Sequence, residues 1–196
     1  MFVRYQHVER IDADETEGLL DGVCHIFPKM DGSNMCAYTE DGKVCTMSRN
    51  KEIQPPEPFA VFIEKNENVR RFLTDFPGLR LYGEWMVPHT VRSYVPETWN
   101  RWFVFDVTAE DTSAEYPWGD GKMLRCDGRQ YIPYEEYAPI LDAYGIEYIP
   151  PLAVIDRPDL KTLERFADVE NTWMVAEGAG CGEGIVVKRY GFVNRF

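Results

Sequence analysis

The first stretch whose residue types could carry chemistry is Lys29-Met30-Asp31-Gly32. A lysine amine is a nucleophile once it is neutral, and it can form a covalent bond to an electrophilic centre. A free lysine has a pKa of about 10.4, so a buried site with cationic neighbours or a metal ion is needed to favour the neutral amine at pH 7. The same residues are also typical of an ordinary turn, in which Asp31-Gly32 form the bend and Lys29 is a solvated charge. The stretch alone leaves both interpretations open.

Three later stretches set a charged side chain within an apolar or glycine-rich segment: Leu81–Met86, Trp102–Val107 and Gly180–Arg189. Glu84 lies inside the first of them, and a carboxylate buried in an apolar strand needs a cation, a metal or a hydrogen-bond donor. Asp106 ends an aromatic strand in the second, whose simplest interpretation is a core strand. These two carboxylates are therefore candidates for a site rather than proof of one.

The third stretch holds Glu183 and Lys188 at the two ends of a predicted strand. Successive side chains of a strand point to opposite faces, so residues an odd number apart lie on opposite faces. A regular strand therefore cannot place Glu183 and Lys188 on one face. We expect Glu183 to act from the start of the strand.

Taken in order, these stretches resemble the motifs of the covalent nucleotidyltransferases, which are the ATP- and NAD-dependent ligases and the mRNA-capping enzymes. The matching segments are Lys29–Gly32, Ser48-Arg49-Asn50, Tyr82–Glu84, Phe105-Asp106 and Glu183–Lys188. Within this superfamily, Ser33-Asn34 and the opening Met1–Tyr5 resemble ATP-dependent RNA ligases of the phage RNA ligase 2 type and their relatives in kinetoplastid RNA editing. A bacterial NAD-dependent ligase would need an extra upstream domain, and only 28 residues precede Lys29. The resemblance therefore implies that ATP is the nucleotide donor.

The resemblance also implies a mechanism and a set of site residues. Lys29 would attack the α-phosphate of ATP and become lysyl-AMP, AMP would pass to an RNA 5′-phosphate, and a 3′-hydroxyl would then seal the strand. The implied catalytic residues are Lys29, Glu183 and Lys188, with Glu183 as the ligand of Mg²⁺ (or Mn²⁺). The implied ATP-binding residues are Lys29, Asp31, Arg49, Glu84, Phe105, Glu183 and Lys188.

The resemblance assigns each of these side chains a part of the nucleotide. Phe105 would stack on adenine, and Glu84 would contact the ribose. Arg49 would contact the ribose or the phosphates, and Lys188 would contact a phosphate. Asp31 would orient the loop that follows Lys29.

The implied partners are RNA ends or a nicked duplex with a 5′-phosphate and a 3′-hydroxyl. The family has a final lysine pair, which does not occur in Tyr190–Phe196, and a C-terminal RNA-engaging domain is absent as well. We therefore expect this chain to bind adenine nucleotide but to self-adenylate slowly. Two alternatives stay open. The chain could seal DNA or transfer a cap, or it could be a nucleotide- or RNA-binding module with weakened catalysis.

Composition narrows the class of protein further. The chain has 196 residues, a hydrophobic content of 44% and a formal net charge of −12 at pH 7. This charge excludes nonspecific coating of nucleic acid and requires a local basic patch for any RNA site. Five cysteines without a C-x-x-C spacing favour reduced thiols, and no apolar run is long enough to cross a membrane. Reduced thiols favour a cytoplasmic protein, and the resemblance implies a bacterial or phage-infected cell.

The mixed order of strands and helices predicts an α+β domain built on antiparallel sheets flanked by helices. The resemblance implies that residues 1–196 form one nucleotidyltransferase domain with an ATP-grasp-like arrangement. Asp41-Gly42 between two β-prone runs predicts a hairpin of Asn34–Thr39 with Lys43–Ser48. The expected helices are 58–76, Pro133–Tyr144 and Pro158–Ala167. The other expected strands are Val23–Phe27, Leu79–Trp85, Trp102–Thr108, Glu147–Ile149 and Gly184–Arg189.

Overall fold

The computed structural model describes residues 3–192, which fall into two compact units. Unit 1 comprises Met1–Tyr5, Ser33–Trp85 and Trp102–Tyr148, and unit 2 comprises Gln6–Gly32, Met86–Arg101 and Ile149–Phe196. Residues 1–2 and 193–196, which include part of the opening and of the closing segment discussed above, lie outside the described residues. The expectation of a single nucleotidyltransferase domain stays a prediction.

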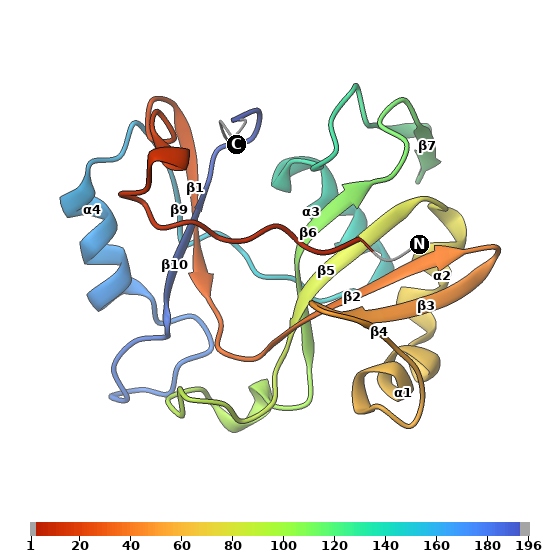
Figure 1. Cartoon of the computed structure of the whole chain (residues 1–196), viewed down its shortest axis with the longest axis horizontal. Coiled ribbons are helices and arrows are strands. Elements are labelled where there is room, and N and C mark those ends of the chain that lie inside the picture. Colours follow the sequence, from red (N-terminus) through yellow and green to blue (C-terminus); the bar gives the residue numbers. More distant parts are fainter. Residues whose placement is uncertain (1–2, 193–196) are drawn as a thin grey trace. The chain divides into compact units, whose positions relative to one another are not determined.

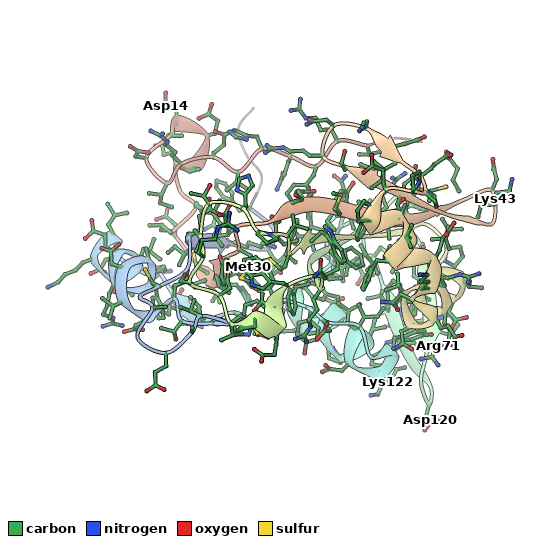
Figure 2. All side chains as sticks on the ribbon, turned by 90° about the horizontal axis from the view of Figure 1, so that it is seen from below. Asp14, Met30, Lys43, Arg71, Asp120 and Lys122 are labelled. Atoms are coloured by element: carbon green, nitrogen blue, oxygen red, sulfur yellow. The ribbon has the colours of Figure 1, made fainter. Side chains whose placement is uncertain are left out.

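Unit 1 is built on a five-stranded antiparallel sheet (Figure 1) with the strand order β4-β3-β2-β5-β6. Its strands are β2 (Ser33–Glu40), β3 (Lys43–Ser48), β4 (Glu52–Ile53), β5 (Leu79–Trp85) and β6 (Trp102–Ala109). The predicted hairpin is confirmed as β2 and β3, and Asp41 and Gly42 both adopt positive φ, 50° and 72°. Such a two-residue turn matches the twist of the strands that it joins. Lys43 lies at its tip (Figure 2).

The predicted helix over residues 58–76 is wrong as a single element. The structure has two helices, α1 (Pro58–Lys65) and α2 (Glu67–Asp75), with a break at Asn66. The Asn66 side chain accepts a hydrogen bond of 3.1 Å from the Val69 N–H, so it caps the start of α2. The predicted helix Pro133–Tyr144 is confirmed as α3 (Tyr134–Tyr144), which ends at Gly145 with φ of 67°.

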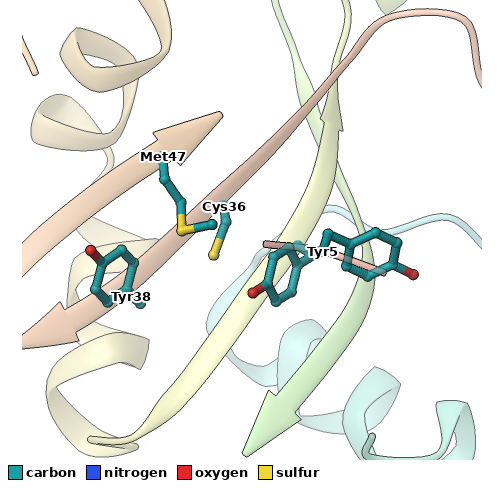
Figure 3. Packing of buried hydrophobic residues seen from close by; sticks show 5 residues of the cluster. Tyr5, Cys36, Tyr38 and Met47 are labelled. Carbon is teal, nitrogen blue, oxygen red and sulfur yellow. The ribbon is translucent and has the colours of Figure 1, made fainter. Parts of the chain in front are cut away.

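One face of the five-stranded sheet of unit 1 carries a buried cluster, shown in Figure 3. The cluster consists of Tyr5, Cys36, Tyr38, Met47 and Tyr82. Cys36 lies opposite both Met47 and Tyr82 in the strand pairing, so the side chains of the cluster share one face. Helices α1 and α2 contact β3 and β2 and contribute buried apolar side chains of their own. The sheet is therefore covered on both faces.

Two further predictions for unit 1 need correction. The predicted strand Glu147–Ile149 is absent, because only one bridge forms there, between Val104 and Tyr148. Asp106 does not end its strand, since β6 continues to Ala109. The small hairpin of β7 (Glu115–Trp118) with β8 (Lys122–Arg125) was not predicted, although Asp120-Gly121 lies in its turn.

Unit 2 contains a three-stranded antiparallel sheet with the order β10-β1-β9 (Figure 1). Its strands are β1 (Val23–Lys29), β9 (Ala153–Asp156) and β10 (Gly184–Lys188). Ile26 of β1 packs on Leu163 of α4 (Leu160–Arg165) and on Phe166, which begins the π-helical segment η3 (Phe166–Glu170). The predicted helix Pro158–Ala167 is thus shorter than expected. Short 3₁₀ turns, η1 (Asp14–Thr16) and η2 (Pro96–Thr98), complete this unit.

The α+β class with antiparallel sheets is confirmed by both units. In the part of the chain that the structure describes, no helix combines the length and the apolar character needed to cross a membrane.

Candidate active site

Lys29 and Glu183 lie side by side in unit 2, although 154 residues separate them in the sequence. Lys29 is the last residue of β1 and pairs with Gly184, the first residue of β10. Glu183 therefore stands immediately before β10, and its carboxylate accepts a hydrogen bond from the Lys29 ammonium group. Both side chains stay accessible, with exposed fractions of 41% and 33%. The expectation that Glu183 acts from the start of the strand agrees with this geometry.

Asp31 is fixed by the segment that follows β5. One carboxylate oxygen lies 2.7 Å from His89 Nδ1, and the other accepts a hydrogen bond from the Val91 N–H. Burial acts to raise the pKa of Asp31, but the bonds from Val91 and His89 outweigh it and hold the pKa below its usual value. Asp31 thus stays ionised and anchors the loop after Lys29, and the orienting role that the resemblance implies for it stays a prediction.

The glycine-rich segment before β10 is anchored by Asn171, which is 1% exposed. The Asn171 carbonyl accepts a hydrogen bond of 2.9 Å from the Gly182 N–H, and its side-chain amide donates to the Gly184 carbonyl. A Cβ atom at residue 182 would lie 2.8 Å from the Asn171 amide nitrogen, so a side chain there would force the Asn171 amide to shift. Asn171 therefore holds the backbone on both sides of Glu183.

Lys188 lies at the far end of β10, opposite His25 of β1. Directly opposed residues share a face, and alternation along β1 places His25, Phe27 and Lys29 on that same face. The Lys188 ammonium group lies 4.8 Å from the centre of the Phe27 ring. Lys29 and Lys188 thus project from one face of the sheet. Glu183 precedes the strand, so strand alternation does not fix the direction of its side chain.

In unit 1, the structure places Glu84 and Phe105 on the neighbouring strands β5 and β6. The pairing skips one residue between Tyr82 and Gly83, so Phe105 is the extra residue of a β-bulge. A Cβ atom at residue 83 would lie 2.5 Å from Trp102 Nε1 and 2.6 Å from the Phe103 carbonyl oxygen. The glycine of the Tyr82–Glu84 motif is thus required for the two strands to approach at the bulge.

Phe105 is half-buried, and its ring packs edge-on against Tyr5 with 5.3 Å between the ring centres. The Tyr5 hydroxyl donates a hydrogen bond to Asp106, whose side chain is buried within β6. Burial and the neighbouring Asp106 raise the pKa of Tyr5 well above its usual value, so Tyr5 remains a donor. The N-terminal segment thereby fixes the bulge that carries Phe105.

Arg49 lies in the turn between β3 and β4 and is half-buried. Ser48 faces Met35, and the next residue of β2, Asn34, faces Glu84. This register places Arg49 at the same end of the sheet as Glu84.

Sequence reasoning missed His89, Tyr94 and Asn171, which contact the segments around Lys29 and Glu183. None of them belongs to a motif, and the histidines looked scattered in the sequence. Residues 3–192 contain no group of three or more His, Cys, Asp or Glu side chains that could hold a metal ion by themselves. Any metal at Glu183 would therefore need oxygen atoms from a substrate or from water.

The chain is similar to known RNA ligases. A family model described as RNA ligase matches residues 24–196, most of the chain, so the chain belongs to the RNA ligase family. Among curated proteins, none matches it.

Solved structures of a Naegleria gruberi RNA ligase share the fold. A mutant without ligand has a TM-score of 0.68, with 18% identity, 95% of this chain covered and 52% of that chain. A mutant with ATP and Mn has a TM-score of 0.68, and a mutant with AMP and Mn has a TM-score of 0.66. In both cases the identity is 18%, and the match covers 95% of this chain and 53% of that chain. The chain thus spans about half the length of these proteins.

Proposed function

We propose that this chain is the adenylating part of an ATP-dependent RNA ligase, with Lys29 as the nucleophile. The observation that carries the proposal is the direct contact of Lys29 with Glu183 across the β1–β10 pair. Two motif residues from opposite ends of the chain meet there at an accessible position. Membership in the RNA ligase family and the fold shared with an RNA ligase solved with ATP and Mn support this function.

In the proposed reaction, the Lys29 nitrogen attacks the α-phosphorus of ATP. A phosphorus–nitrogen bond forms, the bond from the α-phosphorus to the bridging oxygen of pyrophosphate breaks, and pyrophosphate leaves. The amine must give up a proton, and the Glu183 carboxylate is the acceptor that it already contacts. Lys188, on the same face of the sheet as Lys29, supplies positive charge to a phosphate.

The donor atoms present fit a magnesium ion (or Mn²⁺). Mg²⁺ is commonly bound by one or two carboxylates together with substrate phosphates and water. Glu183 offers one accessible carboxylate, and the described residues offer no all-protein cage. When bound, the ion would neutralise charge on the phosphates.

We propose that unit 1 recognises the nucleoside of ATP. Phe105 would stack on adenine, Glu84 would bind the ribose, and Arg49 would bind the ribose or a phosphate. The half-buried position of Phe105 and the common sheet end of Glu84 and Arg49 support these roles.

After adenylation, AMP would pass to a 5′-phosphate of RNA, and a 3′-hydroxyl would displace it and seal the strand. The substrates would be RNA ends or a nicked duplex in the cytoplasm of a bacterial or phage-infected cell. Since the net charge is −12, we expect the RNA to contact a local basic surface.

The test combines labelling with sealing. The protein is incubated with α-labelled ATP and Mg²⁺ or Mn²⁺, and acid-stable label is mapped by peptide analysis. Nicked RNA and nicked DNA duplexes of one sequence are then compared as substrates. Label on Lys29 and faster sealing of RNA are expected. Absence of label with retained ATP binding would identify a binding module, and preference for the DNA nick would identify a DNA ligase.

A further inference from the structure

The segment Met86–Arg101, which follows β5, contains no residue of the recognised motifs but contacts both loops of the candidate site. It is fixed within unit 2 by backbone hydrogen bonds of 2.9 Å from Val95 to Met174 and 2.8 Å from Ala176 to Ser93. Tyr94, between these anchors, forms an antiparallel bridge with Val175 and is only 4% exposed. Its side chain is therefore held rigidly.

The Tyr94 hydroxyl oxygen accepts hydrogen bonds from two backbone N–H groups. The first comes from Asp31 at 3.0 Å, and the second comes from Glu183. A phenolic oxygen has two lone pairs, so it can accept both bonds at once. One buried oxygen atom thus joins the loop after Lys29 to the loop that carries Glu183.

We propose that Tyr94 is a positioning residue of the adenylation reaction, whose hydroxyl oxygen sets the Lys29 and Glu183 loops at the spacing at which their side chains meet. This inference rests on the proposed function. Tyr94 acts through the two backbones and need not touch the nucleotide.

The chemistry of the phenol suits this role better than that of a carboxylate or an amide. An ordinary phenol is neutral at physiological pH, so the side chain adds no negative charge beside the phosphates. The β1–β10 pairing ends at Lys29 and Gly184, so the sheet itself places no hydrogen bond beyond this pair. Without the hydroxyl, two N–H groups would lose their acceptor. The remaining links would be the side chains of Lys29 and Glu183 and the bonds that Val91 and Ser93 make to Asp31 and to the Cys181 carbonyl.

The test uses Tyr94→Phe, which removes one oxygen atom and keeps the ring. The matched control is Tyr116→Phe, because Tyr116 is also buried, at 7% exposure, and its hydroxyl donates a 2.7 Å hydrogen bond to the Pro77 carbonyl in unit 1. Amide exchange at Asp31 and Glu183 is followed by NMR in all three proteins. The rate of lysyl-AMP formation and the KM for ATP are measured in parallel, with melting temperatures as the stability readout.

We expect both amides to exchange faster in Tyr94→Phe and to keep their wild-type rates in Tyr116→Phe. Adenylation by Tyr94→Phe should slow about 10- to 100-fold, the usual loss when a group that orients a reacting residue is removed, with little change in KM. Cooling well below the melting temperature should not restore the rate. If the Tyr94 hydroxyl had a purely structural role, Tyr94→Phe and Tyr116→Phe would lower the melting temperature alike. The adenylation rate of Tyr94→Phe would then be unchanged.

Three results would overturn the inference: unchanged exchange at both amides in Tyr94→Phe, faster exchange with wild-type adenylation, or exchange without protection at Asp31 and Glu183 in the wild type. The last measurement decides the matter even if Tyr94→Phe does not fold. If the wild type fails to form lysyl-AMP at all, the proposed function is wrong. In that case the amide exchange rates at Asp31 and Glu183 alone test whether Tyr94 joins the two loops.

Discussion

Replacement of Lys29 by alanine should abolish adenylation while it leaves the fold almost unchanged. The Lys29 and Glu183 side chains are 41% and 33% exposed, so their ion pair is a surface interaction. Such pairs contribute about 0–1 kcal/mol to stability. For a chain of this size, that loss lowers the melting temperature by about 2–4 °C at most. Because Lys29 is the proposed nucleophile, the loss of its side-chain nitrogen should remove the reaction completely.

Two further variants separate charge from nucleophilicity. Lys29→Arg keeps a cation beside Glu183, so it should recover the stability, but a guanidinium stays protonated and should not accept AMP. Lys122→Ala is the surface control, since the Lys122 ammonium group lies 4.6 Å from the centre of the Trp118 ring. This cation–π contact is worth about 0.5–1 kcal/mol, which matches the loss expected at Lys29. Lys122→Ala should adenylate like the wild type.

The assay is acid-stable labelling with α-labelled ATP, followed by peptide mapping and melting curves for all four proteins. Label on another lysine of the Lys29→Ala protein would refute the assignment of the nucleophile. A fall in melting temperature of more than about 10 °C in Lys29→Ala would show that Lys29 has a structural role that its exposure does not reveal.

Three other predictions follow from particular contacts. Phe105→Ala should weaken ATP binding about 5- to 150-fold, because stacking on a base is worth about 1–3 kcal/mol, and calorimetry that finds unchanged affinity in a folded variant would exclude the stacking role. The pKa of Asp31 is lower in the folded protein than in the unfolded chain, so its contribution to stability is present above about pH 4 and is lost as the pH falls through the folded pKa. Asp31→Asn should therefore be less stable than the wild type at neutral pH, and unfolding curves should show this difference shrinking in acid. Gly182→Ala should lower the melting temperature and slow adenylation, because the new Cβ would lie 2.8 Å from the Asn171 amide nitrogen. Gly184→Ala is the control, since its Cβ would have no atom within 4 Å, and it should lose less stability. Equal losses of melting temperature would contradict this reasoning.

The sequence was sufficient for the elements whose local chemistry is strong. Asp41-Gly42 fixed the hairpin, and Gly145 fixed the end of α3, because each signal acts within a few residues. It was insufficient at Asn66, where the apolar spacing continues through a side-chain cap that splits one helix into two. Strand β9 was missed because only its pairing with β1 defines it, and that partner lies more than a hundred residues away.

The same distinction applies to the site. Lys29, Asp31, Glu183 and Lys188 could be selected from motif spacing, and the face-alternation argument correctly placed Glu183 outside the strand. Gly83 of the Tyr82–Glu84 motif and Gly182, which precedes Glu183, were visible but unexplained, because the Trp102 ring and the Asn171 amide beside them come from distant segments. No local pattern distinguishes Asn171 or Tyr94 from an ordinary buried polar residue.

The chemistry and the geometry of this site therefore have different sources in the chain. The side chains proposed to react belong to short motifs, and such motifs can be recognised because the proposed reaction needs their residue types. Their orientation comes from single polar residues of other segments that bind backbone groups: Tyr94 at Asp31 and Glu183, and Asn171 at Gly182 and Gly184. At such a position the requirement is for one well-placed hydrogen-bonding atom, so no sequence pattern marks the residue. Variants at Tyr94 and Asn171 should consequently tolerate replacements that keep the hydrogen-bonding atom, whereas Lys29 should tolerate none.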